Sequence, residues 1–155
     1  MHTFLNTPVG VLKLTVQDDK LTGIEFVQKI LSKKNQSNEN KKSFEKIIQQ
    51  LNQYFKNSAF LFDLPFQLNV TPFQKKVLSA MQKIPSGETK TYGELALELK
   101  TSARAIGQAC RKNPISIVIP CHRVTAKNNL GGFAGKKSGR LLDIKKYLLM
   151  HENVK

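Results

Sequence analysis

The chain has few of the residues from which cross-linked or metal-stabilised proteins are built. Its 155 residues include two cysteines, Cys110 and Cys121, and three histidines. These counts exclude a disulfide framework and a structural zinc site, and we expect neither a metal nor a cofactor. No apolar run approaches the roughly 18–20 residues that span a bilayer, so we expect no membrane segment. The N-terminus lacks the basic start and long apolar stretch of a signal peptide, which together with free thiols predicts a cytoplasmic protein.

Acidic residues are also scarce. The 11 Asp and Glu stand against 25 Lys and Arg, which gives a net charge of +14. The excess is +3 over residues 1–68 and +11 over residues 69–155. A basic second half predicts a polyanionic partner, most often nucleic acid, although charge that serves only solubility is the alternative. Because apolar residues make up 40% of the chain, we expect a globular protein and not a disordered basic tail.

The first half has the pattern of a small antiparallel sheet followed by a helix. Three strands are predicted, at His2–Leu5, Gly10–Val16 and Leu21–Val27. The polar residues 28–42 predict a surface connection with little regular structure. Ser43 is a candidate N-cap for the helix that follows, and the apolar stripe of this helix comprises Ile47, Ile48, Leu51 and Phe55.

The second half is predicted to be helical. Thr71 followed by Pro72 marks the start of one helix. Two shorter helices, 92–100 and 103–112, are separated by a tight break, which is the spacing of a helix-turn-helix. One face of the latter helix is polar, basic and low in profile, and it comprises Arg104, Gly107, Gln108 and Arg111. Small residues beside arginines favour close approach to a nucleic-acid groove, although a solvated surface has a similar pattern.

A candidate nucleophile follows this helix. Residues 115–119 predict a buried strand, which ends at Pro120 and is followed by Cys121 and His122. A thiol of pKa about 8.5 needs a base or a positive environment to react near neutrality. Adjacent residues of an extended chain point to opposite faces, so a bridging water or a local turn would have to connect the two side chains. On the dipeptide alone, two purely structural residues are the alternative.

The last predicted helix offers a third member of this site. Its apolar stripe, Leu141, Ile144 and Leu148, continues one turn further to Glu152. A carboxylate at the end of an apolar stripe needs a partner, and a histidine would suit it as the group that fixes the tautomer. The alternative is a frayed helix end that leaves Glu152 in solvent, with His151 as its neighbour.

The sequence around Cys121 resembles the acceptor-site signature of the O6-alkylguanine-DNA alkyltransferases, also called methylated-DNA–protein-cysteine methyltransferases. The signature is Pro120-Cys121-His122-Arg123-Val124. Further stretches match this family in the same order, and they are Thr71-Pro72-Phe73-Gln74, residues 84–89, residues 91–96, residues 103–107, Arg111-Lys112-Asn113-Pro114 and residues 148–152. The resemblance is strong over about residues 70–152 and weaker at residues 7–10 and 21–24.

The resemblance implies a fold of the α+β class. An RNase H-like domain with a small antiparallel sheet and a helix, residues 1–68, would pack on a winged helix-turn-helix-like domain, residues 69–155. It also implies the function: a suicide reaction in which an alkyl group moves from O6 of a flipped-out guanine to Cys121, with O4-alkylthymine as a second candidate substrate. The partner would be double-stranded DNA, bound by a monomer, with cooperative binding as the alternative.

The resemblance also implies roles for individual residues. His122 would act through a water as the general base for Cys121, Glu152 would orient His122, Asn113 would hold the turn, and Tyr92 would donate toward the guanine. Arg104 would replace the extruded base in the stack. The other DNA contacts implied are Ala103, Gly107, Gln108, Arg111, Thr71 and Arg123. The substrate pocket would be formed by Val124, Phe133, Ala134 and Gly135, with a phenylalanine at position 133 where the family often has tyrosine and a short insertion at 136–140.

Two other functions fit parts of the sequence. A non-catalytic DNA-binding module, either a lesion sensor or a transcription regulator, would use the same basic face. The retained Cys121 argues against the sensor, and the small residues of 103–111 offer a regulator few base-reading side chains. A thiol hydrolase would use Cys121 and His122, but no oxyanion motif accompanies them. Cys110 is predicted to be a core residue beside Ile106.

Overall fold

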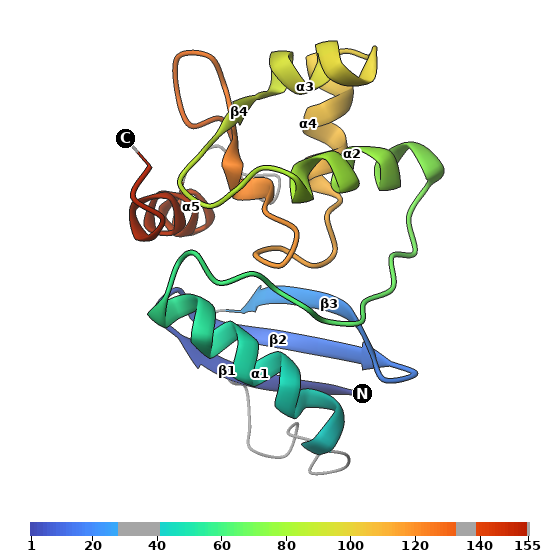
Figure 1. Cartoon of the computed structure of the whole chain (residues 1–155), viewed down its shortest axis with the longest axis vertical. Coiled ribbons are helices and arrows are strands. Elements are labelled where there is room, and N and C mark those ends of the chain that lie inside the picture. Colours follow the sequence, from blue (N-terminus) through green and yellow to red (C-terminus); the bar gives the residue numbers. More distant parts are fainter. Residues whose placement is uncertain (28–40, 133–138, 155) are drawn as a thin grey trace. The chain divides into compact units, whose positions relative to one another are not determined.

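The computed structural model describes residues 1–27, 41–132 and 139–154 (Figure 1). The chain divides into two compact units, Met1–Asn69 and Val70–Lys155. The first unit contains an antiparallel sheet and a helix, and the second is mainly helical. The prediction of a mixed α+β protein is therefore confirmed.

The sheet of the first unit is the predicted meander. Its strands β1 (His2–Thr7), β2 (Gly10–Gln17) and β3 (Lys20–Val27) pair antiparallel in the order β1-β2-β3. Asp18 and Asp19 turn the chain between β2 and β3 with φ of 52° and 59°. Aspartate tolerates this left-handed conformation better than most residues, which is why this pair makes a tight hairpin.

Helix α1 (Lys41–Lys56) lies across one face of this sheet (Figure 1). Its buried residues Phe44, Ile47, Leu51 and Tyr54 form the core of the unit with the inward side chains of the strands. Ser43 is not the N-cap, because the helix begins two residues earlier and the Ser43 hydroxyl donates to Asp19 Oδ1 at 2.6 Å. Most of the predicted surface connection, residues 28–40, lies outside the described residues.

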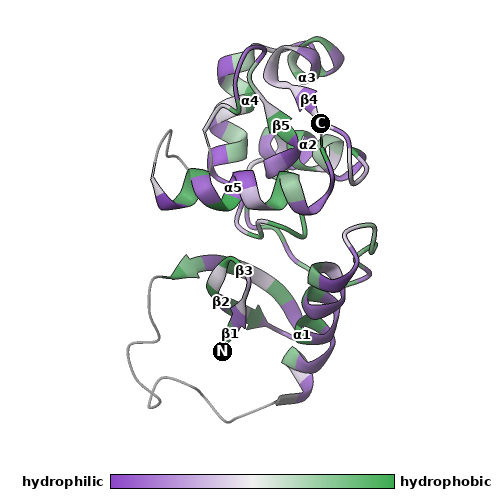
Figure 2. Ribbon diagram, turned by 90° about the vertical axis from the view of Figure 1, so that its left-hand side faces the viewer, coloured by the Kyte–Doolittle hydropathy of each residue, from purple (hydrophilic) through white to green (hydrophobic). Residues whose placement is uncertain are grey.

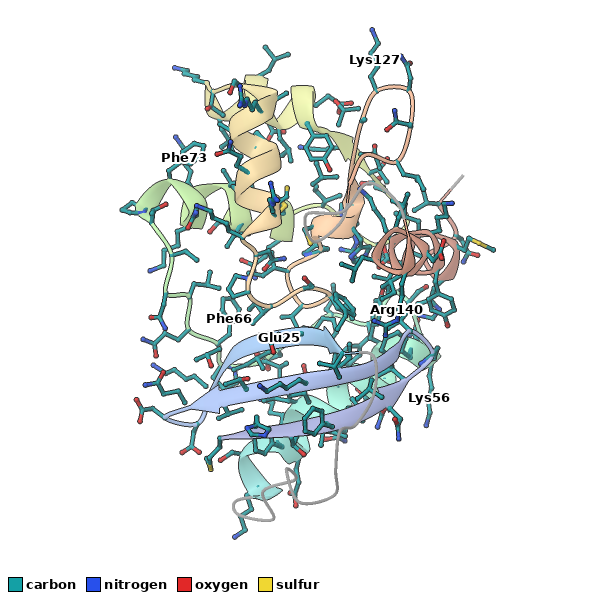
Figure 3. The ribbon with its side chains drawn as sticks, turned by 180° about the vertical axis from the view of Figure 1, so that it is seen from behind. Glu25, Lys56, Phe66, Phe73, Lys127 and Arg140 are labelled. Carbon is teal, nitrogen blue, oxygen red and sulfur yellow. The ribbon has the colours of Figure 1, made fainter. Side chains whose placement is uncertain are left out.

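The second unit begins with helix α2 (Pro72–Gln82), whose predicted start is confirmed. Thr71 Oγ1 accepts from Gln74 N, and Gln74 Oε1 accepts from Thr71 N, both at 3.1 Å. This reciprocal capping box satisfies two backbone donors at the helix start. Val77, Leu78 and Met81 of α2 are buried, whereas Phe73 remains 40% exposed on its outer side (Figure 3).

The helix-turn-helix is formed by α3 (Tyr92–Leu99) and α4 (Ala103–Arg111). Lys100 ends α3 in the left-handed conformation, with φ of 55°, and Ser102 caps α4 by accepting from Ala105 N at 3.1 Å. Ile106 and Ala109 of α4 are buried, while Arg104, Gln108 and Arg111 are exposed. The predicted basic face of this helix is therefore exposed, and the opposite face is packed in the core.

The remaining elements hold the segment around Cys121. A 3₁₀ helix, η2 (Cys121–Arg123), leads into β5 (Val124–Thr125), which pairs parallel with β4 (Lys90–Thr91). Helix α5 (Arg140–His151) follows, and it carries both hydrophobic and hydrophilic residues (Figure 2). Within the described residues, no helix is long and apolar enough to cross a membrane.

The predicted strand at 115–119 is wrong. Ile119 N donates to Ile115 O at 3.0 Å, so the chain folds back on itself in a tight turn. Ile117 in this turn has φ of 78°, a conformation that a β-branched side chain rarely adopts. The residue is buried at 1% exposure, so surrounding packing holds this strained backbone four residues before Cys121.

Candidate active site

The turn that carries Cys121 is tied by Asn113. The amide Nδ2 of Asn113 donates to Ile119 O at 2.9 Å, and its Oδ1 accepts from Ile115 N at 3.1 Å. One side chain therefore binds both ends of the strained turn. Cys121 N donates to Ile119 O at 2.8 Å, and the thiol then begins the 3₁₀ helix.

The Cys121 thiol is buried, with 5% of the residue exposed. Burial raises its pKa, while hydrogen bonds from Asn113 and Ser116 and the positive charge of Lys145 act in the opposite direction. The Ser116 hydroxyl lies 3.9 Å from the sulfur. Because the net shift is upward, the resting group is a thiol, and a base has to remove its proton for it to act as a nucleophile.

His122 and Glu152 form a buried pair. His122 Nε2 lies 2.8 Å from Glu152 Oε2, and both side chains have no exposed surface. The sequence alternative of a frayed, solvated Glu152 is therefore wrong. Burial lowers the pKa of His122 more than Glu152 raises it, so the imidazole is neutral. With Nε2–H donating to the carboxylate, Nδ1 carries the lone pair, and this buried atom has no hydrogen-bond partner among the described residues.

Arg123 does not extend toward solvent as the predicted DNA contact requires. Its Nε and Nη2 donate to Glu152 Oε1 and Oε2 at 2.8 and 3.0 Å, and Nη1 donates to Ile84 O at 2.6 Å. The side chain is 12% exposed. All three nitrogens of the guanidinium therefore have partners inside the protein, and the DNA contact of Arg123 stays a prediction.

No sequence pattern predicts a role for Lys145, which is fully buried in α5. Its ammonium donates to the carbonyls of Val124, Leu130 and Gly132 at 2.7, 2.5 and 2.9 Å. It also lies 5.9 Å from the centre of the Tyr92 ring. Burial lowers the pKa of Lys145 to about 8, so the ammonium with its three donors persists at neutral pH. No sequence signal marks this lysine among the many basic residues of the second half.

A cavity of about 960 Å³ joins the thiol to the basic face of α4. Its lining brings the predicted catalytic residues Cys121 and Tyr92 together with most of the residues predicted for DNA contact, which are Ala103, Arg104, Gly107, Gln108 and Arg111. Cys110 also lines it, and this half-buried residue packs with its sulfur 3.4 Å from Sδ of the buried Met81. Lys127, at the tip of the loop after β5, points into solvent (Figure 3).

The other predicted pocket and DNA residues are placed differently. Val124 is fully buried, and its carbonyl accepts from Lys145. Thr71 is exposed and caps α2. Phe133, Ala134 and Gly135 lie outside the described residues. Burial raises the pKa of Tyr92 to about 12, so its hydroxyl remains a donor, and it lies 3.5 Å from Gly132 O.

Gly131 is expected to be intolerant of a side chain. It has φ of 71°, and an added Cβ would lie 2.8 Å from Tyr92 Cε2 and 3.3 Å from Ala126 N. Gly131→Ala should therefore lower the free energy of unfolding by about 2 kcal/mol or more, through backbone strain and displacement of Tyr92.

The matched control is Gly107→Ala, since nothing lies within 4 Å of an added Cβ there. That variant should gain about 0.5–1 kcal/mol from helix propensity, and urea denaturation compares the two. Equal stability of both variants would contradict the prediction.

Family models match both halves of the chain. Residues 1–68 match the ribonuclease-like domain of 6-O-methylguanine DNA methyltransferase, and residues 72–154 match the DNA-binding domain of the same family. Among curated relatives, the constitutive methylated-DNA–protein-cysteine methyltransferase of Bacillus subtilis is 34% identical, over 99% of this chain and 95% of that protein. The corresponding protein of Methanosarcina acetivorans is 36% identical, over 97% of each chain.

Solved structures agree with this assignment. The O6-methylguanine methyltransferase of Mycobacterium tuberculosis superposes with a TM-score of 0.82 at 30% identity, covering 98% of this chain and 92% of that one. The structure of Mycobacterium tuberculosis OGT in complex with DNA gives a TM-score of 0.80 at 32% identity, with the same coverage. Sequence, fold and the buried Cys-His-Glu arrangement lead to one conclusion: the chain belongs to the O6-methylguanine-DNA methyltransferase family.

Proposed function

We propose that this protein repairs DNA by moving an alkyl group from O6 of guanine to Cys121, once per protein molecule. The observation that carries the proposal is the position of the Cys121 thiol in a cavity that also reaches the exposed basic face of α4. A buried thiol can react only with a group brought into its cavity, so the damaged base has to leave the duplex stack. Methylation of O6 weakens base pairing and thereby lowers the cost of flipping.

The reaction balances as one displacement. The thiol proton passes through a water to His122 Nδ1, while Nε2–H remains bonded to Glu152. The sulfur attacks the alkyl carbon, an S–C bond forms, and the C–O6 bond breaks with its electron pair moving to the guanine. The base accepts a proton from its surroundings and leaves as ordinary guanine. Tyr92, kept protonated by its raised pKa, donates toward the ring as negative charge develops there.

The thioether product explains why we propose a single turnover. Reversal would require a poor leaving group, a thiolate, to depart from an alkyl carbon with no activating charge. Removal of the alkyl group from Cys121 would need a second nucleophile activated by His122. Among the described residues, the only side-chain partner of His122 is Glu152. One protein molecule is thus consumed for each lesion.

Duplex binding is assigned to α4 as a proposal. Arg104, Gln108 and Arg111 are exposed on one side of this helix, and Gly107 between them leaves space for close approach. Arg104 would fill the position of the extruded base, and Ala103 would border the groove. We propose that the protein is a monomer in the cytoplasm and associates with DNA there. Each phosphate contact should contribute about −0.9 to the slope of the logarithm of the binding constant against the logarithm of the salt concentration.

The test is to incubate the full chain with a duplex that contains one O6-methylguanine and to map the modified peptide by mass. We expect one methyl group per protein molecule, on Cys121, and restored guanine in the duplex. A methyl group on another residue, or repeated turnover by one molecule, would contradict the proposal. Binding of the lesion without any transfer would instead support the non-catalytic sensor, and hydrolysis of an ester would support a thiol hydrolase.

A further inference from the structure

Arg123 and His122 share one buried carboxylate. Glu152 Oε2 lies 2.8 Å from His122 Nε2 and 3.0 Å from Arg123 Nη2, and Oε1 lies 2.8 Å from Arg123 Nε. A guanidinium in a protein is always charged. The group of three is therefore electrically neutral when His122 is neutral, and it gains one positive charge when His122 binds a proton.

We propose that Arg123 is a positioning residue for the alkyl transfer: by neutralising the Glu152 carboxylate it keeps His122 uncharged and able to accept the proton of Cys121. This inference rests on the proposed function, because it assigns the regulation of the base in that reaction. It also gives a reason for burying an arginine directly beside the acceptor dipeptide.

Burial makes an uncompensated charge on Glu152 costly. A buried carboxylate without a cation would take up a proton, either on itself or on the neighbouring imidazole. In both forms the His122–Glu152 pair would have lost its capacity as a base. With Arg123 in place the carboxylate is already compensated, so a further proton would leave an unpaired positive charge in a buried site.

The charges around His122 come from two elements. Lys145 lies within α5, Glu152 follows the last residue of α5, and Arg123 lies in η2. Burial is the largest effect on the His122 pKa and lowers it, Glu152 raises it, and Arg123 and Lys145 both lower it. Of the two cations, only Arg123 bonds the carboxylate that His122 bonds, so it is the one whose removal changes the pair directly.

Geometry supports the same role. The third donor of Arg123, Nη1, is held by the carbonyl of Ile84, which follows α2 and is itself buried. The guanidinium is therefore fixed between the end of α2 and the end of α5. Two bonds from the guanidinium hold the carboxylate, Oε2 lies 2.8 Å from His122 Nε2, and the buried Nδ1 has no hydrogen-bond partner among the described residues.

The test uses Arg123→Gln, which removes the charge but keeps an amide that can donate to Glu152. In the full chain, the His122 ring is titrated by NMR; with three histidines, its signals are assigned by single replacement of the others. We expect the pKa of the His122–Glu152 pair to rise by about 1–3 units. The acidic limb of the single-turnover pH–rate profile should move to higher pH by the same amount.

Two further variants make the result specific. Arg123→Gln combined with Glu152→Gln removes both charges, so its His122 pKa should be no higher than that of the wild type. Arg140→Met removes an exposed arginine at the start of α5 and should leave the pKa unchanged. If Arg123→Gln does not fold, Arg123→Lys replaces it. Because lysine retains the positive charge, the pKa of His122 in this variant should rise by less than about half a unit.

The outcomes separate the inference from the proposed function. An unchanged His122 pKa in Arg123→Gln, with a loss of rate that is equal at every pH, would overturn the role of Arg123. A raised pKa in Arg123→Lys equal to that expected for Arg123→Gln would overturn it as well. A wild-type chain that transfers no alkyl group at any pH would contradict the proposed function, while the NMR titration would still decide how Arg123 acts on His122.

Discussion

Cys121→Ser is expected to slow alkyl transfer by at least about 10³-fold while duplex binding is retained. The hydroxyl occupies less space than the thiol, so the cavity keeps its lining and the basic face of α4 is unaffected. An alcohol, however, is far harder to ionise than a thiol. A neutral His122 paired with Glu152 cannot generate an alkoxide at neutral pH, so the displacement loses its nucleophile.

The matched control for this prediction is Cys110→Ser, which alters the other cysteine that lines the cavity. Burial raises the pKa of Cys110 to about 12, and its sulfur contacts Met81 and not a base. We therefore expect methyl transfer in this variant to remain on Cys121. A rapid-quench assay with a radiolabelled O6-methylguanine duplex, followed by peptide mapping, measures both variants. Labelling of Cys110 in the Cys121→Ser protein would show that the cavity, and not the His122 network, determines the acceptor.

Local signals in the sequence were sufficient where a short segment determines its own conformation. Thr71 and Pro72 start α2 because the cap, the fixed φ of proline and the Gln74 side chain act within one turn of helix. The Asp18–Asp19 turn likewise depends on the tolerance of two adjacent residues for positive φ. The apolar stripe that ends at Glu152 was also visible, although only the fold could show that His122 meets it.

Sequence patterns failed where distant parts of the chain determine the conformation. Residues 115–119 have the composition of a buried strand, yet Asn113 closes them into a turn that forces Ile117 into left-handed geometry. Arg123 and Lys145 are charged, and charged residues are mostly exposed, so a sequence pattern assigns them to the surface. Their partners are Glu152, 29 residues away from Arg123, and backbone carbonyls from the loop after β5.

Lys145→Met is expected to lower the free energy of unfolding by about 2–4 kcal/mol, because three buried or partly buried carbonyls lose their donor. Methionine has a similar length and fits the space, so the loss comes from unpaired acceptors and only to a small extent from packing. Removal of the charge also reduces the cost of burying a cation, which is why we do not expect the full sum of three lost hydrogen bonds.

Transfer should slow in the same variant for a different reason. Leu130 and Gly132 line the cavity, and their carbonyls are tied to α5 by Lys145, so the cavity wall loses its attachment. The ammonium also lowers the pKa of the Cys121 thiol, so its removal makes the thiol harder to ionise. We therefore expect a lower rate even at temperatures where the variant is fully folded.

Lys146→Met is the control, because Lys146 directly follows Lys145 in the same helix and is exposed. Its stability should lie within about 0.5 kcal/mol of the wild type, as is usual for surface substitutions. Urea denaturation followed by circular dichroism gives both free energies, and single-turnover assays give both rates. Equal stability of the two variants would mean that water replaces the ammonium at the three carbonyls. In that case a reduced rate in Lys145→Met alone would assign Lys145 to the reaction and not to the fold.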